Sequence, residues 1–192
     1  MQKIELEIVA LSHSVTQSNS YAVILGEVNG VRRLPIVIGG FEAQAIAVAL
    51  ENMHPSRPLT HDLMKNLMSS FDIQLQEVFI CDLQEGIFFS KLVCFTANDT
   101  IEIDSRTSDA LALAVRFGCP IYVYAHILEQ AGLENEGGEK VVAPITATIE
   151  NKKTDLSSLS LTELNELLNE VLEQEDYMRA IDIRDEINKR NP

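Results

Sequence analysis

The sequence predicts an α+β fold, in which helices pack on a mixed, mainly antiparallel sheet and a C-terminal α-helical hairpin follows. Strand-like apolar runs occur in two groups, and segments with helical spacing lie between and after them. The last thirty or so residues show only helical periodicity. We therefore predict a compact domain at 1–133, a linker at 134–158 and a helical hairpin at 159–192.

The first group of strands comprises residues 3–12 and the two apolar runs on either side of Asn29-Gly30. Asn-Gly is the pair that best tolerates positive φ at both central positions of a type I′ turn, so we expect a tight hairpin there. Pro35 cannot donate a hydrogen bond to a sheet ladder. The third strand is therefore expected at an edge, or with its proline turned away from a neighbour.

Two helices are predicted next, at 41–53 and 55–71. The second has Pro58 just before its start and Thr60 as its predicted N-cap. The residues expected on the buried side of the first helix are Ile46, Ala49, Leu50 and Met53. Those expected on the buried side of the second are Leu63, Leu67 and Met68.

The second group of strands is predicted to form a meander, because Glu85-Gly86 and Asn98-Asp99 are good turn formers. A helix that stops at Gly118, a last strand and a short closing helix complete the domain. The predicted strands are 73–83, 86–95, 100–104 and 120–125, and the predicted helices are 105–118 and 126–133.

The predicted linker contains Gly, Pro, Lys and Thr that interrupt every periodicity, although residues 141–149 could alternatively add an edge strand. The tail beyond it contains two amphipathic helices. A pair this short buries too little surface to be stable alone, so we expect it to dock on a partner or on a second copy. The apolar stripes comprise Leu161, Leu164, Leu168 and Val171, then Tyr177, Ile181 and Ile187 with Arg184.

Composition limits the functional classes. The net charge of −14 argues against non-specific adhesion to nucleic acid, which depends on Lys and Arg. The three cysteines, Cys81, Cys94 and Cys119, indicate buried thiols, with a Cys81–Cys94 disulfide as the alternative. No apolar run reaches the roughly 18 residues of a membrane span, and the opening residues do not resemble a signal peptide. We expect a cytoplasmic protein without membrane contact.

Polar residues gather at three places: Glu42 in the first turn of a helix, residues 57–62 around a helix start, and residues 104–109 at a strand-to-helix junction. Cations, hydroxyls, an imidazole and carboxylates near helix N-termini suit phosphate chemistry. Simple capping is the alternative for each segment. No glycine-rich phosphate loop, nucleophile elbow or HExxH motif is present.

Three segments resemble the bifunctional nuclease family in their residues, order and spacing: IGGFEAQAIAVALE, RPLTHDL and IDSRTSDALALAVR. The chain has Thr107 where proline is common in that family. The resemblance implies nuclease activity on DNA and RNA. The tail LLNEVLEQEDYMRAIDIRDEI is similar to the UVR motif of bacterial excision-repair proteins, which implies a protein partner and a bacterial origin.

The leading hypothesis is phosphodiester hydrolysis of DNA or RNA, assisted by Mg²⁺ or Mn²⁺ and without an organic cofactor. The runner-up is a non-catalytic regulatory or adaptor protein, which the acidity and the lack of a basic stripe favour. Edge strands and the short hairpin also suggest a homo-oligomer. The predicted catalytic residues are Glu42, His61, Asp62 and Asp109; the predicted substrate-binding residues are Arg57, Thr60, Arg106 and Ser108; the predicted metal ligands are Glu42, Asp62 and Asp104.

Overall fold

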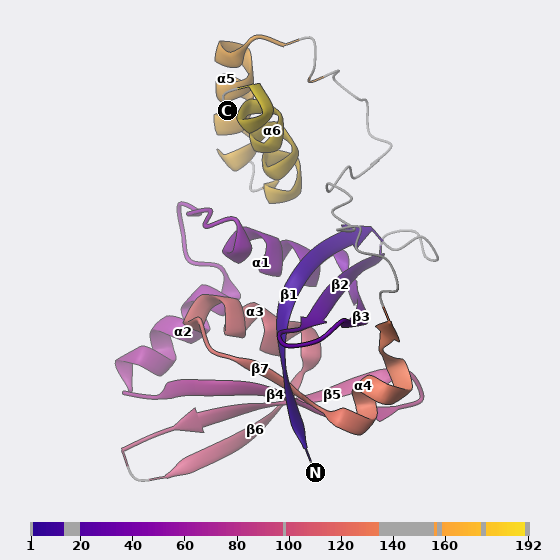
Figure 1. Cartoon of the computed structure of the whole chain (residues 1–192). Coiled ribbons are helices and arrows are strands. Elements are labelled where there is room, and N and C mark those ends of the chain that lie inside the picture. Colours follow the sequence, from indigo (N-terminus) through magenta and orange to yellow (C-terminus); the bar gives the residue numbers. More distant parts are fainter. Residues whose placement is uncertain are drawn as a thin grey trace.

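The computed structural model describes residues 2–13, 20–97, 99–134, 156, 159–173 and 176–190. Within them an eight-stranded sheet has the order β6-β5-β4-β7-β1-β2-β3-β8, with helices packed on it (Figure 1). The strands are β1 (Lys3–His13), β2 (Ser20–Glu27), β3 (Arg32–Gly39), β4 (Gln74–Gln84), β5 (Ile87–Phe95), β6 (Thr100–Arg106), β7 (Ile121–Tyr124) and β8 (Leu133–Glu134). The helices are α1 (Gly40–Leu50), α2 (Thr60–Ser70), α3 (Thr107–Phe117), α4 (Ala125–Ala131), α5 (Leu161–Glu173) and α6 (Tyr177–Arg190).

The sheet consists of two antiparallel meanders, β1-β2-β3 and β4-β5-β6, joined through β7. Strand β7 pairs antiparallel with β1 and parallel with β4, which makes the sheet mixed but mainly antiparallel. The predicted fold class is therefore confirmed. On the outer edge of β3, β8 pairs only with Arg32 and Arg33, so Pro35 lies beyond that short pairing, in keeping with the edge position expected for it.

The two predicted hairpin turns differ in outcome. Glu85 and Gly86 both have positive φ, 50° and 81°, and form the tight turn expected between β4 and β5. Neither Asn29 nor Gly30 is among the described residues with positive φ, so the predicted type I′ turn is wrong. A longer loop separates β2 from β3 instead, and Arg32 closes it with two hydrogen bonds to the Glu27 carboxylate, of 3.0 and 2.9 Å.

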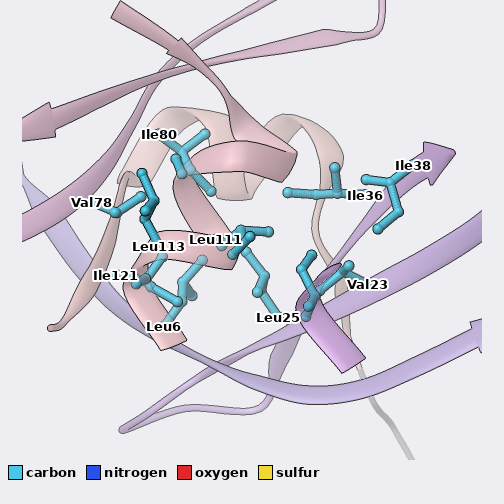
Figure 2. Packing of buried hydrophobic residues seen from close by; sticks show 14 of the residues in the cluster. Leu6, Val23, Leu25, Ile36, Ile38, Val78, Ile80, Leu111, Leu113 and Ile121 are labelled. Carbon is cyan, nitrogen blue, oxygen red and sulfur yellow. The ribbon is translucent and has the colours of Figure 1, made fainter. Parts of the chain in front are cut away.

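The core lies between the sheet and helices α1 and α3. Figure 2 shows Leu111 and Leu113 of α3 among side chains from several strands of both meanders, including Leu6, Leu25 and Val78. Helix α3 ends as predicted at Gly118, whose φ of 66° is left-handed. The buried residues of α1 are Ala43, Ile46, Ala47 and Val48, so the predicted inward position of Leu50 is wrong.

Helix α2 differs from the prediction in both its cap and its buried face. Its N-cap is Leu59 and not Thr60. Leu63 and Leu67 are 62% and 56% exposed, and Met68 is the buried residue of this helix. Periodicity identifies an apolar face but does not say whether a neighbour covers it, and α2 packs mainly against α3 at the side of the core.

The C-terminal hairpin packs on its own chain. Leu164, Val171, Ala180 and Ile183 form the small core between α5 and α6. Ile181 of α6 joins the main core, and Arg184 donates a hydrogen bond of 2.8 Å to the Glu51 carbonyl and pairs with the Glu51 carboxylate. The structure therefore shows the hairpin docked on α1 of the same chain, and the partner or second copy expected from the sequence stays a prediction.

Strand β8, which the sequence did not predict, lies at the end of the predicted domain. Most of the predicted linker, including the alternative strand at 141–149, lies outside the described residues. All three cysteines are free thiols, so the disulfide alternative is wrong. In the described parts of the chain, no helix has the length and apolar character needed to cross a membrane.

Candidate functional site

The candidate site is assembled from the first turns of three helices. Glu42 follows the β3-to-α1 junction, and His61 is in the first turn of α2. Arg106 ends β6 as the N-cap of α3, and Asp109 lies in the first turn of that helix. Helix N-termini carry partial positive charge and orphan N–H groups, so their convergence favours anionic groups at this position.

Arg106 links the two acids of the site. Its Nη1 donates to Glu42 Oε1 at 2.9 Å, while Nε and Nη2 donate to Asp109 Oδ2 and Oδ1 at 2.7 and 3.0 Å. The guanidinium has five N–H donors, and these bonds use three of them. Because the Arg106 side chain is 67% exposed, the two remaining donors can reach a ligand.

His61 completes the site. Its Nε2 lies 3.1 Å from Asp109 Oδ1, and its side chain is 15% exposed. In the neutral ring, a carboxylate in this position accepts from Nε2–H and leaves the Nδ1 lone pair free, so the imidazole can accept a proton there. We call Glu42, Arg106, Asp109 and His61 the Arg106 cluster.

Asp109 stays ionised within the Arg106 cluster. Burial would raise the pKa of its carboxyl, but hydrogen bonds from Arg106 and His61 outweigh burial and hold this pKa below its ordinary value. Asp109 therefore carries a negative charge near neutral pH and keeps its role as acceptor for the His61 ring.

A groove of about 650 Å³ opens beside the Arg106 cluster. Residues of β3 line one side, and β5, β6 and the start of α3 line another, although β3 and β6 lie near opposite ends of the sheet order. Glu42 and Arg106 reach the groove, and so do Asp104 and Ser108. Much of the remaining lining is apolar, contributed by Ile36, Val37, Ile38, Leu83, Ile87, Phe88 and Phe89.

Asp62 belongs to a different arrangement. Its Oδ1 accepts 2.6 Å from Arg116 Nε, and its Oδ2 accepts from the Leu59 N–H at 2.9 Å. Burial would raise the pKa of Asp62, but these two hydrogen bonds and the charge of Arg116 lower it. Both carboxylate oxygens are therefore occupied by groups that fix the start of α2.

Arg116 is the main residue that the sequence reasoning missed. Its side chain is 5% exposed, and Nη1 donates to the carbonyls of Ala45 in α1 and Ala112 in α3, at 2.8 and 3.0 Å. With Asp62 it ties three helices together. A single arginine within the apolar run of α3 was the available signal, since a buried arginine requires partners.

The other predicted residues occupy varied positions. Ser108 is buried and lines the groove, while Asp104 is exposed on its rim, opposite Lys91 in the β5–β6 register. Arg57 and Thr60 are exposed, and neither has a contact that ties it to the Arg106 cluster in the described chain. The structure thus brings together Glu42, His61, Arg106 and Asp109, with Ser108 and Asp104 along the adjoining groove.

Thr107, at the position where proline is common in the resembling family, forms hydrogen bonds with its side chain. Its Oγ1 donates to the Phe88 carbonyl at 2.9 Å and lies 2.7 Å from the Ser90 hydroxyl. Both hydroxyl-bearing side chains are buried. The start of α3, which carries Arg106 and Asp109, is therefore fixed to β5 by a buried pair of hydroxyls.

The predicted metal ligands do not form a chelating group. Among the described residues, no three His, Cys, Asp or Glu side chains are arranged to hold an ion. Glu42 accepts a hydrogen bond from Arg106, and Asp62 accepts one from Arg116. Asp104 lies on the rim of the groove. With the Glu42 and Asp62 carboxylates bonded to arginines, the arrangement does not fit the Mg²⁺ or Mn²⁺ site expected from the sequence.

Fold and site define an α+β domain whose polar centre is built from three helix N-termini beside a partly apolar groove. Residues 23–136 match the family model described as the bifunctional nuclease domain, and the chain belongs to that family. A relative from Mycobacterium tuberculosis strain H37Rv, "Uncharacterized protein Rv1829", is 43% identical over 145 residues, which are 74% of this chain and 87% of the relative.

Relatives whose names include an activity are more distant. "Bifunctional nuclease 1" of Arabidopsis thaliana is 22% identical over 167 residues, covering 81% of this chain and 51% of the plant protein. "Bifunctional nuclease" of Oryza minuta is 27% identical over 114 residues, covering 58% of this chain and 33% of that protein. The chain therefore spans about half of the Arabidopsis protein and about a third of the Oryza minuta protein.

Proposed function

We propose that the chain is a nuclease that hydrolyses phosphodiester bonds of DNA or RNA at the Arg106 cluster. The observation that carries this proposal is the hydrogen-bonded series Glu42–Arg106–Asp109–His61, of which Glu42 and Arg106 line the groove. Membership of the bifunctional nuclease domain family and the names of the plant relatives support it.

Arg106 is proposed to bind the scissile phosphate. Its two unused N–H donors can each bond a non-bridging oxygen, and charge-assisted bonds of this kind strengthen as negative charge develops in the transition state. Glu42 and Asp109 hold the guanidinium from two sides, so it is oriented before substrate arrives. In this account Glu42 is a positioning residue.

His61 is proposed to activate water. Its Nδ1 takes a proton from the water as the oxygen attacks phosphorus, and the bond between phosphorus and the leaving oxygen breaks. The leaving oxygen takes a proton from solvent, and His61 later returns its own to solvent. Asp109 accepts from Nε2–H throughout, which orients the ring and stabilises the imidazolium.

The predicted dependence on Mg²⁺ or Mn²⁺ remains a prediction. It requires Glu42 or Asp109 to leave Arg106 before it can bind an ion, since both carboxylates are bonded to that guanidinium. The roles proposed for Asp62, Arg57 and Thr60 likewise remain predictions from the sequence, as do the homo-oligomer and the similarity of the tail to the UVR motif.

A regulatory or adaptor protein is the second candidate. Arg106 is already paired with two carboxylates, and much of the groove is apolar, so the site also suits a ligand that is bound and released unchanged. The hairpin docked on α1 would then present a surface to a protein partner.

Cleavage assays separate these candidates. Protein purified to homogeneity would be incubated with single-stranded and duplex DNA and RNA, with Mg²⁺, with Mn²⁺ and with a chelator, beside His61→Ala, Glu42→Ala and His54→Ala. His54 is exposed and has no assigned role, so that variant controls for the substitution itself. Cleavage should fall about 100-fold or more in His61→Ala and stay unchanged in His54→Ala. Equal cleavage by all four proteins would indicate a contaminant and defeat the proposal.

A further inference from the structure

An exposed aromatic ring lies beside Arg106 in the groove. Phe89 of β5 and Arg106 of β6 are directly paired in the antiparallel register, so their side chains are neighbours on the same face of the sheet. Both line the groove, and Phe89 is 38% exposed. A large apolar ring left in solvent beside a guanidinium with two free donors places a stacking surface next to a phosphate-binding group.

The charges of the groove limit which polyanion can enter it. Arg106 is the one Lys or Arg among the described lining residues, and Glu42 and Asp104 are negative. Binding of duplex nucleic acid depends on several cations that track the phosphates. Stacking of bases on aromatic side chains needs no such track, but it does need bases that are not already paired.

We infer that the groove binds single-stranded nucleic acid, with one base stacked on Phe89 and the adjacent phosphate held by Arg106. Ile87 and Val37, which are also exposed along the groove, would contact the sugar and the edge of that base. The inference rests on the proposed function where it concerns cleavage of the bound phosphodiester. Binding of the single strand does not depend on cleavage. Base stacking makes Phe89 the residue that selects unpaired strands over duplex.

Binding and cleavage can be measured separately. Fluorescence anisotropy in the presence of a chelator would use a labelled oligonucleotide of about ten residues, as DNA and as RNA, against the matched duplex. The variants are Phe89→Ala, Phe89→Trp and, as a matched control, Phe95→Ala. Phe95 is on the same strand and similarly exposed, at 42%, but does not line the groove. Light scattering on each variant would report the subunit number.

Single strands should bind more tightly than duplex. Phe89→Ala should weaken single-strand binding at least about fivefold, Phe89→Trp should restore it and Phe95→Ala should leave it unchanged. Equal binding of duplex, no binding at all, or no effect of Phe89→Ala would overturn the inference. A change of subunit number in Phe89→Ala, with binding unaffected, would identify the groove as a contact between copies and overturn it too. Binding through Phe89 without any cleavage would instead defeat the proposed nuclease activity and leave this inference standing.

Discussion

His61 Nε2 and Asp109 Oδ1 lie 3.1 Å apart, although 48 positions separate the two residues in the sequence. The contact joins the first turn of α2 to the first turn of α3. Arg106 shares the same aspartate, so one carboxylate orients both the proposed base and the proposed phosphate-binding group. Asp109 is therefore the residue on which the proposed chemistry depends most.

Replacing Glu42 by Gln tests its role as a positioning residue. The amide oxygen can still accept from Arg106, while one negative charge leaves the groove, so we expect single-strand binding to tighten a few-fold and kcat to stay within about threefold of the wild-type value. Steady-state kinetics would separate kcat from KM. A loss of kcat of about 100-fold would instead assign Glu42 a direct catalytic or metal-binding role.

Replacing Arg116 by Ala should destabilise the fold by about 3 kcal/mol, because it removes a buried guanidinium and leaves the partly exposed Asp62 carboxylate and two carbonyls without that partner. Chemical denaturation would measure the free energy of unfolding. Asp62→Asn should also destabilise, but by less, since the amide keeps an acceptor for Arg116.

The Asp62→Asn variant also tests whether Asp62 acts in catalysis. If its role is structural, Asp62→Asn assayed well below its melting temperature should retain most of kcat. A loss of kcat of about 100-fold in a folded Asp62→Asn protein would return Asp62 to the catalytic group predicted from the sequence.

Asp182 of α6 should make stability depend on pH. Burial, and then the nearby Asp185 and Asp176, raise the pKa of its carboxyl from 3.8 to about 6, while Lys189 acts in the opposite direction. The folded state therefore holds this proton more tightly than the unfolded state. Its contribution to stability is full below about pH 4 and is lost as pH rises towards 6.

Asp182→Asn removes this dependence. At pH 7.5 the variant should be more stable than the wild type by about 1 kcal/mol, a value reduced from the pKa difference because the carboxyl is only partly buried. Melting temperatures at pH 4.5 and 7.5 would measure the difference. A variant that shows the same change with pH as the wild type would assign the dependence to other groups, such as Asp109.

Docking of the hairpin should depend on Ile181, which is fully buried in the main core. Ile181→Ala should cost about 2–4 kcal/mol locally and speed amide exchange in α6 and in the end of α1 that it covers. Leu161→Ala is the matched control, because Leu161 is partly exposed on α5. Unchanged exchange in the Ile181 variant would mean that the hairpin is not held at this site.

The sequence predicted the positions of the strands and helices well, but it predicted poorly which side chains are in contact in the folded chain. The alternation of apolar and polar residues, together with the turn residues, located every strand except β8. Strand β8 has two residues and is too short to show a period. The Asn29-Gly30 turn failed because Glu27 and Arg32 close a longer loop. The predicted buried face of α2 is wrong because periodicity shows which side chains are apolar, but it does not show whether another helix covers them.

The site was predictable to a similar extent. Residue chemistry at helix starts pointed to Glu42, His61, Arg106 and Asp109, which the fold brings into contact. Asp62 has the same chemistry, yet it pairs with Arg116, which is 54 positions away. Phe89 carries no motif, and only the register of β5 with β6 places it beside Arg106. Pairings over such distances depend on tertiary packing.

A double-mutant cycle on His61 and Asp109 tests the central claim most directly. Cleavage of a single-stranded oligonucleotide would be measured for the wild type, His61→Ala, Asp109→Asn and the double variant, after each is shown to be folded. If Asp109 acts through His61 and Arg106 in one site, each single variant should lose about 100-fold or more, and the double variant little beyond the slower of the two. Losses that multiply in the double variant, or a wild type that cleaves nothing, would contradict the account.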